Sequence, residues 1–478
     1  MRVWLWRAVA RLPVEKGFLR VDGRANSTAR ALLFNRFESR AGEPARCLRL
    51  IVNFCRSFTL LPTDSLRFGK RKSARWRVER LRAYDFTMLN HLHLARWADV
   101  LVRHATDIQP GNLVRITSMP AAEPLLEAVY RRVLEAGGIP VVNCKPEFLT
   151  EAFYELANEQ QLDWESPFTM LETQTVDATI NLSALTNLRS LDKFDTAVTQ
   201  RAARANKANR ELLFQRAAVA DDPTLDSDLK PLLWSTTLYP TNAYAQDAGM
   251  SLRDYHEFVI RACQLNHEDP VAFWRSLDEW QVQLAEQLMT GSELHFRTPA
   301  GTDLKVNTAG MRWLSSPGRK NFPDGEVYSG PNLNASNGGA EGVVFFDKRC
   351  VYQGHAVRNA RIVMENGRAT EVTAEEGEDF LLAMLDQDEG ARRIGEVAFG
   401  TNRAIDRPTG QILYDEKMGG SFHLAFGAGY PETGNTNKSA LHWDLIASLG
   451  VGSEVTLDGQ SFSKDGRFVT MPPEVTWL

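Results

Sequence analysis

The sequence has few cysteines, no long apolar segment and neither of the common nucleotide-binding motifs. Its five cysteines are scattered and none shows C-x-x-C spacing, which argues against a disulfide framework and against a cysteine zinc site. No apolar run approaches the roughly 20 residues that cross a bilayer, and the basic, apolar start lacks a small-residue cleavage site. We therefore expect a cytoplasmic protein that does not bind membranes. Neither G-x-G-x-x-G nor G-x-x-x-x-G-K follows the first predicted strand of the folded part, so no nucleotide site is indicated.

Length and charge divide the chain into unlike parts. A chain of 478 residues is long for one hydrophobic core, which predicts two domains. Residues 1–82 hold 20 Lys and Arg against 6 Asp and Glu, so the total formal charge of −5 leaves −19 on the remainder. We expect residues 1–84 to be a basic extension, either disordered or the result of a start assigned upstream of Met88. A tail that binds phosphate groups is the alternative for this segment.

The part after residue 84 begins with alternating helix and strand patterns. Apolar spacing predicts helices and strands in turn over 92–104, 113–117, 121–136, 139–143 and 175–182. This β-α-β rhythm predicts an N-terminal α/β domain with a parallel sheet over 85–290. Further helices are expected over 191–218 and as a pair within 252–288.

The composition changes near residues 285–295, where glycines become frequent and short strand patterns alternate with turns. Strands are predicted over 294–298, 303–307, 342–346 and 360–365. We therefore predict a β-rich C-terminal catalytic domain over 291–478, which makes the whole chain a combination of α/β and α+β structure.

Histidines and acids with metal-ligand character gather in residues 411–444. His442 and Asp444 are separated by one residue, and alternate residues of a strand share a face. His423 lies in a second strand pattern. Two strands that bring two imidazoles and a carboxylate to one cleft would supply most of a divalent-metal site.

Two glutamates could complete that site. Glu326 follows a Pro-Asp-Gly turn, and Glu396 follows Gly395; each precedes a short apolar run. Burial of a carboxylate is costly unless a cation or hydrogen bonds compensate it. Taken alone, each acid is more simply a solvated residue at the end of a strand; together with the histidine motifs they favour a metal centre.

Four blocks in this half resemble the thermophilic-type metallo-aminopeptidases, the aminopeptidase T and S group. The blocks are NFPDGEVYSGP, RRIGEVAFGTN, ILYDEKMGGSFHLAFGAGYPETG and NKSALHWDL, at 321–331, 392–402, 412–434 and 437–445. The similarity in order and spacing runs from about residue 89 to the C-terminus. Between Tyr430 and His442 the chain is shorter than in many members, which bears on pocket shape.

The resemblance implies an enzyme that removes N-terminal amino acids with two divalent metal ions, described as zinc, cobalt or magnesium. It implies five metal ligands, which are Glu326, Glu396, His423, His442 and Asp444. It also implies that Tyr430 lies at the active site. From the chemistry of such a site we expect Tyr430 to donate a hydrogen bond to the oxyanion and Glu396 to move the proton of the attacking water. The implied partners are peptides with a free N-terminus and a second copy of the chain in a homodimer.

Two other functional classes remain open at this point. Another dinuclear metal-dependent hydrolase, an amidase or a phosphoesterase, could use the same ligands, although no Arg or Lys clamp for phosphate adjoins the motifs. A protein that binds nucleic acid through its basic N-terminus is disfavoured, because the acidic remainder would repel a phosphate backbone.

Overall fold

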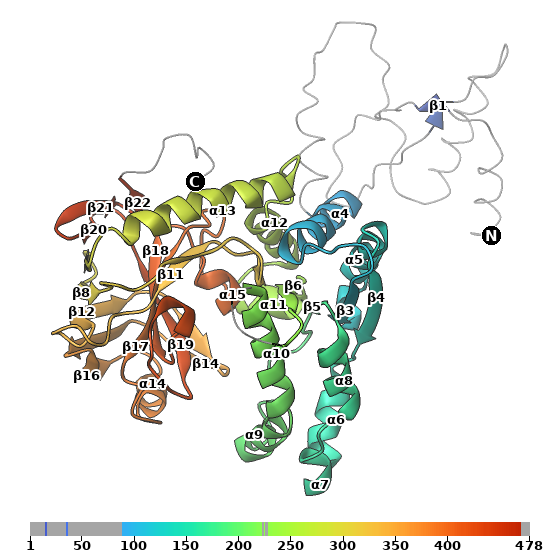
Figure 1. The fold of residues 1–478 in the computed structure, drawn as a ribbon, viewed down its shortest axis with the longest axis horizontal. Helices are drawn as coiled ribbons and strands as arrows, with labels where there is room; N and C mark the ends of the chain where they lie inside the picture. The colour runs from blue at the N-terminus through green and yellow to red at the C-terminus, as the bar shows by residue number, and fades with distance from the viewer. Residues whose placement is uncertain (1–14, 17–34, 37–87, 222–223, 225–227, 470–478) are drawn as a thin grey trace, which may run out of the picture. The chain divides into compact units, whose positions relative to one another are not determined.

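The structure, a computed structural model, describes residues 15–16, 35–36, 88–221, 224 and 228–469 (Figure 1). Two compact units are distinguished, Met1–Arg77 and Val78–Leu478. The basic extension predicted over 1–84 lies outside the described residues, apart from two short strands that pair antiparallel, β1 (Glu15–Lys16) and β2 (Asn35–Arg36). The prediction for that segment therefore stays a prediction.

A five-stranded parallel sheet forms the first half of the second unit. Its strand order is β10-β6-β5-β3-β4, and every neighbouring pair is parallel. The strands are β3 (Leu113–Ser118), β4 (Ile139–Cys144), β5 (Ala178–Ser183), β6 (Leu233–Leu238) and β10 (Asn321–Phe322). The predicted α/β fold with a parallel sheet is confirmed, and β10 joins this sheet from far along the chain.

Helices connect these strands and cover the sheet (Figure 1). The first ones are α4 (His91–Val100), the π-helical turn η2 (Leu101–Ala105), the 3₁₀ turn η3 (Pro120–Ala122) and α5 (Glu123–Glu135). Those between β4 and β6 are α6 (Phe148–Leu156), α7 (Glu159–Leu162), α8 (Pro167–Thr175), α9 (Thr196–Ala205) and α10 (Lys207–Asp221). The single helix predicted over 191–218 is instead two helices, interrupted at Asn206, whose side-chain amide donates to the Ala202 carbonyl oxygen at 3.3 Å.

Three helices then lead to the second half: α11 (Asn242–Asp247), α12 (Leu252–Ala262) and α13 (Pro270–Leu288). Helix α13 packs against α4 and also against β9 and β11 of the C-terminal half. Its Trp274 is fully buried, with its ring 5.2 Å from that of Phe322. This apolar contact fixes β10 and the turn that follows it, which leads directly into the candidate site.

Two antiparallel sheets make up most of the C-terminal half. One has the order β19-β18-β17-β11-β9 and the other β16-β15-β12-β8-β7-β20-β21-β22. The first contains β9 (Leu314–Ser316), β11 (Glu326–Ser329), β17 (Ile394–Gly400), β18 (Ser421–Gly427) and β19 (His442–Ser448). The second contains β7 (Glu293–Arg297), β8 (Asp303–Asn307), β12 (Ala340–Phe346), β15 (Ala360–Glu365), β16 (Arg368–Thr373), β20 (Glu454–Leu457), β21 (Gln460–Lys464) and β22 (Arg467–Phe468).

Smaller elements complete this half: the hairpin β13 (Cys350–Tyr352) and β14 (His355–Val357), the helices α14 (Glu378–Leu385) and α15 (Ile412–Asp415), and the 3₁₀ turn η4 (Pro431–Thr433). The β-rich character predicted for this half is confirmed. The division into domains at 85–290 and 291–478 stays a prediction; α13 ends at Leu288 and β7 begins at Glu293.

Strands β17 and β18 are the middle of the core. All seven residues of each are buried, because aromatic side chains cover one face: the ring of Phe296 lies 4.5 Å from that of Phe422 and 5.7 Å from that of Phe399. Polar side chains on the other face are therefore also withdrawn from water. Among the described helices, none combines the length and apolar character needed to span a membrane.

Candidate metal centre

Four neighbouring strands carry the five predicted ligands. Glu326 opens β11, Glu396 lies in β17, His423 in β18, and His442 and Asp444 in β19. In the register of this sheet, Ala425 pairs with both Glu396 and Asp444, His442 pairs with Gly427, and Glu326 pairs with Gly400. Paired residues and alternate residues share a face, so all five side chains emerge on one face of the sheet.

These five residues, here called the carboxylate–imidazole cluster, converge at their polar ends. The Nε2 atom of His423 lies 3.4 Å from Glu326 Oε2, 3.6 Å from Glu396 Oε1 and 3.8 Å from Asp444 Oδ1. The Nε2 atom of His442 lies 3.3 Å from Glu396 Oε2 and 3.9 Å from Asp444 Oδ1. The structure thus brings together every residue that the sequence analysis proposed as a ligand.

Two groups of three can each surround an ion. The His423 position consists of Glu326, Glu396 and His423, and the His442 position of Glu396, His442 and Asp444; the ligand atoms of each group lie within 4.8 Å of one another. Glu396 belongs to both and turns a different oxygen to each histidine. A carboxylate shared in this way is the arrangement expected between two adjacent ions.

Unpartnered polar atoms show that the cluster fits a metal. Glu326 Oε2, Asp444 Oδ1 and both ring nitrogens of His423 are buried without a hydrogen-bond partner. Such atoms are costly unless something compensates them. Two ligand atoms at about 2.1 Å from a tetrahedral ion are about 3.4 Å apart, close to several of the separations here. Mixed carboxylate and imidazole donors suit a divalent cation.

The charge state of the cluster also fits a cation. Burial raises the pKa of Glu326 to about 7 and that of Asp444 to about 6. Burial opposes ionisation of Glu396 as well, but the imidazoles of His423 and His442 outweigh it and lower its pKa to about 2. Burial disfavours the imidazolium forms, yet the adjacent carboxylates, Glu396 foremost, raise the pKa of His423 to about 9 and of His442 to about 10. Without a metal, protons on the two imidazoles supply the positive charge beside the carboxylates. A bound metal ion would take over this role, and the imidazole protons would be released.

His442 is held in one orientation. Its Nδ1 donates to the Ala428 carbonyl oxygen at 2.9 Å, which leaves Nε2 free for a ligand role. The hydroxyl of Tyr430 lies 3.3 Å from that Nε2, and the two rings are 5.0 Å apart. The structure therefore places the predicted catalytic tyrosine at the rim of the cluster. Burial and the nearby Glu396 carboxylate raise the pKa of the Tyr430 hydroxyl well above its usual range, so it stays a donor.

Sequence reasoning missed a buried cation and two of its partners. Lys417, at 1% side-chain exposure, contacts Glu326 Oε1 at 2.5 Å, Glu416 Oε1 at 2.6 Å and Asp324 Oδ1 at 3.4 Å. Glu416 also forms a third possible ion group with His423 and Asp444. In the sequence, Glu416 and Lys417 belong to the charged run Asp415-Glu416-Lys417, and nothing local in that run indicates burial beside the cluster.

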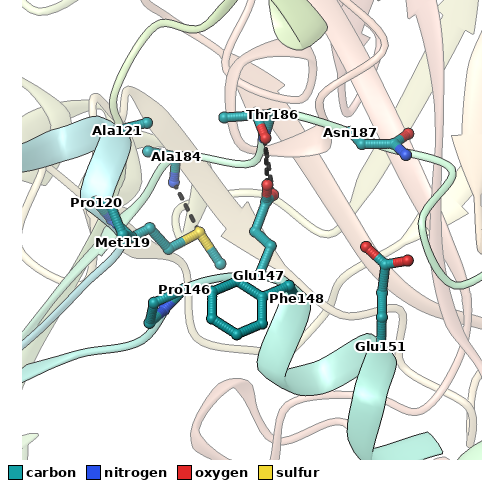
Figure 2. A pocket seen from close by; sticks show the side chains of 10 residues that line it. All are labelled: Met119, Pro120, Ala121, Pro146, Glu147, Phe148, Glu151, Ala184, Thr186 and Asn187. Atoms are coloured by element: carbon teal, nitrogen blue, oxygen red, sulfur yellow. Dashed lines mark hydrogen bonds between the residues drawn. The ribbon is translucent and has the colours of Figure 1, made fainter. Parts of the chain in front are cut away.

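A separate hollow lies at the ends of the parallel strands (Figure 2). It has a volume of about 350 Å³ and is lined mainly by the segments that follow β3, β4 and β5, including Met119, Phe148 and Ala184. Its polar groups are already engaged: Glu147 accepts from the backbone nitrogen of Thr186 at 2.7 Å, and Glu151 lies 3.7 Å from Lys193. The carboxylate–imidazole cluster, by contrast, contains buried polar atoms without hydrogen-bond partners and is the candidate site.

Comparisons with known proteins identify the family of the chain. Residues 90–468 match the model of a family described as thermophilic metalloprotease (M29). Aminopeptidase 2 of Geobacillus stearothermophilus is 26% identical over 412 residues, which cover 78% of this chain and 95% of that protein. Aminopeptidase T of Thermus aquaticus is 33% identical over 248 residues, covering 46% of this chain and 58% of that protein.

A solved structure shares the fold. Wild-type AmpT from Thermus thermophilus superposes with a TM-score of 0.67 at 24% sequence identity. The match covers 79% of this chain and 99% of that one, so the α/β part and the β-rich part occur together in the related structure.

Proposed function

Because the chain belongs to the thermophilic metalloprotease (M29) family, we propose that it is an aminopeptidase that releases the N-terminal residue of peptides with two divalent ions. Membership of the family makes it a metal-dependent peptide hydrolase. The ligands in this proposal are the five residues of the carboxylate–imidazole cluster. The names of the relatives, Aminopeptidase 2 and Aminopeptidase T, support an N-terminal site of cleavage.

One observation carries the proposal of two ions. Glu396 directs Oε1 toward His423 and Oε2 toward His442, at 3.6 and 3.3 Å. A single ion would occupy one of the two positions and leave the imidazole of the other without a metal to bind. The unpartnered atoms at the His423 position support an ion there as well as at the His442 position. The oxygen-rich donor set is compatible with zinc, cobalt or magnesium.

The chain's own residues supply the acid–base chemistry. Bound divalent ions would lower the pKa of a water molecule and polarise the scissile carbonyl. Glu396, which lies between the two proposed ion positions, accepts the proton of the attacking water and returns it to the leaving amine. Tyr430, protonated at neutral pH, donates a hydrogen bond to the carbonyl oxygen as negative charge develops there.

Blocked substrates give a direct test of this function. The full chain, supplied with Co²⁺ or Zn²⁺, is expected to release p-nitroaniline from aminoacyl p-nitroanilides and to leave the N-acetylated compounds intact. Equal rates on both series would reject the N-terminal specificity. Treatment with EDTA should abolish the activity, and re-addition of metal should restore it; activity that resists exhaustive chelation would reject metal dependence.

The number of ions is tested separately. Elemental analysis of the active protein after dialysis should find close to two ions per chain. Activity that is maximal with one ion per chain would reject the two-ion proposal while leaving the peptidase function intact.

A homodimer is the proposed assembly, and an exposed apolar surface supports it. Strand β4 is an edge of the parallel sheet, and Ile139, Val141 and Val142 on it are at least 40% exposed. The helices that follow carry further exposed apolar side chains, including Phe148 and Leu156. Surfaces of this kind commonly mark contacts between proteins. Sedimentation at twice the chain mass is expected, with Val142→Glu shifting it toward the monomer; a parent protein that sediments as a monomer would reject the dimer.

The cytoplasm is the proposed location. The cysteines within the described residues, Cys144, Cys263 and Cys350, are all free, which is the usual state in a reducing compartment. Fractionation of cells of the source organism would test it, and recovery of the protein outside the cytoplasm would overturn it.

A further inference from the structure

Lys417 is a buried cation placed directly beside the carboxylate–imidazole cluster. It follows the short helix α15 and is 1% exposed. Three carboxylates, those of Glu326, Glu416 and Asp324, lie within 3.4 Å of its Nζ atom. Lys417 is therefore an ammonium ion with no access to water, next to residues that are suited to hold divalent metal.

The contacts of Lys417 are confined to one side of the cluster. Its two short ion pairs, at 2.5 and 2.6 Å, are with Glu326 and Glu416. Glu326 belongs to the His423 position, and Glu416 forms an ion group with His423 and Asp444. Within the part of the chain that the structure describes, Lys417 forms no ion pair with the His442 position, that is, with Glu396, His442 or Asp444.

Lys417 also determines how Glu326 can act. Its ammonium group pairs with Oε1 of that carboxylate. The other oxygen, Oε2, has no hydrogen-bond partner, lies 3.4 Å from His423 Nε2 and is available to a cation. A bound cation at the His423 position would therefore share Glu326 with the ammonium group. Like charges in a buried site repel each other strongly, because little solvent screens them.

We propose that Lys417 is a positioning residue that makes the two ion positions unequal. It holds the Glu326 and Glu416 carboxylates in place and weakens cation binding at the His423 position relative to the His442 position. The first ion then binds at the His442 position, and the second binds more weakly at the His423 position. This inference rests on the proposed two-ion function.

Titration of the metal-free full chain with Co²⁺ tests the proposal by calorimetry and by the absorption of bound Co²⁺. The parent protein should bind two ions in separate steps that differ in affinity by at least about tenfold. In Lys417→Met, the second step should become tighter by about 10- to 100-fold, because the repulsion between two buried positive charges is removed. The first step should change by less than about threefold. Lys305→Met is the matched control, since Lys305 pairs with Glu293 at 2.8 Å and both side chains are partly exposed, and it should change neither step.

A merely structural role for Lys417 predicts the opposite sign. If the ammonium only supported the fold, its loss would misplace Glu326 and weaken the second step. Weaker or unchanged second-step binding in Lys417→Met therefore overturns the proposal while leaving the two-ion function intact. Binding of a single ion by the parent protein would reject the two-ion function and this proposal together.

Asp324→Asn provides an independent test, also usable if Lys417→Met does not fold. Asp324 is fully buried, lies 3.4 Å from the Lys417 ammonium and belongs to none of the three ion groups. Removing its charge leaves Lys417 less compensated, so the second step should weaken several-fold with the first step unchanged. An unchanged second step would contradict a role for the charge of Lys417.

Discussion

The Nδ1 atom of His442 lies 2.9 Å from the carbonyl oxygen of Ala428, and this contact aims Nε2 of the imidazole at Glu396. The same carbonyl oxygen is crowded from the other side. A Cβ atom placed on Gly395 would lie 2.2 Å from it. The glycine that precedes Glu396 is therefore required by the backbone that orients His442 two strands away.

Replacement of Gly395 with alanine should disturb this orientation. The methyl group must displace the Ala428 carbonyl and with it the acceptor for His442. We expect metal affinity to fall by about 10- to 100-fold, as for other groups that orient metal-bound histidines, measured by Co²⁺ titration. Gly450→Ala is the matched control, because neither glycine has a positive φ and nothing lies within 4 Å of a Cβ placed on Gly450. Metal affinity that is lowered equally in the two variants would refute the argument.

Replacement of Glu396 with glutamine should remove the proton acceptor with almost no change in shape. Turnover is expected to fall by about 10²- to 10⁴-fold, the usual contribution of general acid–base catalysis, in assays with aminoacyl p-nitroanilides. Glu432→Gln, an exposed acid in η4, should keep the parent rate. A Glu396→Gln variant with near-parent turnover would show that another group moves the proton.

Replacement of Tyr430 with phenylalanine tests the hydroxyl alone. Loss of one donor to an oxyanion typically costs about 10²- to 10³-fold in kcat, and the bound metal content should be unchanged. Tyr352→Phe is the control. Its ring stacks 5.1 Å from that of Trp443, and Trp443 points to the face of β19 opposite His442 and Asp444, because successive side chains of a strand alternate. If Tyr430→Phe lowered metal content instead of kcat, its hydroxyl would be acting through His442.

The sequence could indicate the five residues that lie together in the cluster because their signals are local. His442 and Asp444 alternate along one strand, and Glu326 and Glu396 each follow a glycine at the start of a strand. These patterns require only that each strand forms, and the resemblance between whole motifs gave the order of the ligands.

The same reasoning could not find Lys417 because its environment is made by tertiary contacts. Its partner Glu326 is 91 residues away in the chain, and they meet only once β11 and the loop after α15 take up their places. A lysine in the sequence Asp-Glu-Lys looks like a solvated surface residue. The same limit applies at Asn206. The residues on both sides of it favour a helix, but the helical backbone is interrupted there, between α9 and α10.

His104 predicts a pH dependence of stability that lies outside the metal centre. It is 3% exposed, its Nε2 donates to the Pro317 carbonyl oxygen at 2.8 Å, and burial lowers its pKa from 6.5. Because the unfolded chain then binds the proton more readily, this stabilisation is complete above about pH 6.5 and is lost as the pH falls below it. Urea unfolding in chelating buffer should show the free energy of unfolding falling between pH 7 and 5, with a smaller slope in His104→Gln. His267→Gln, at an exposed histidine, should retain the parent slope, and a parent slope in His104→Gln would contradict the prediction.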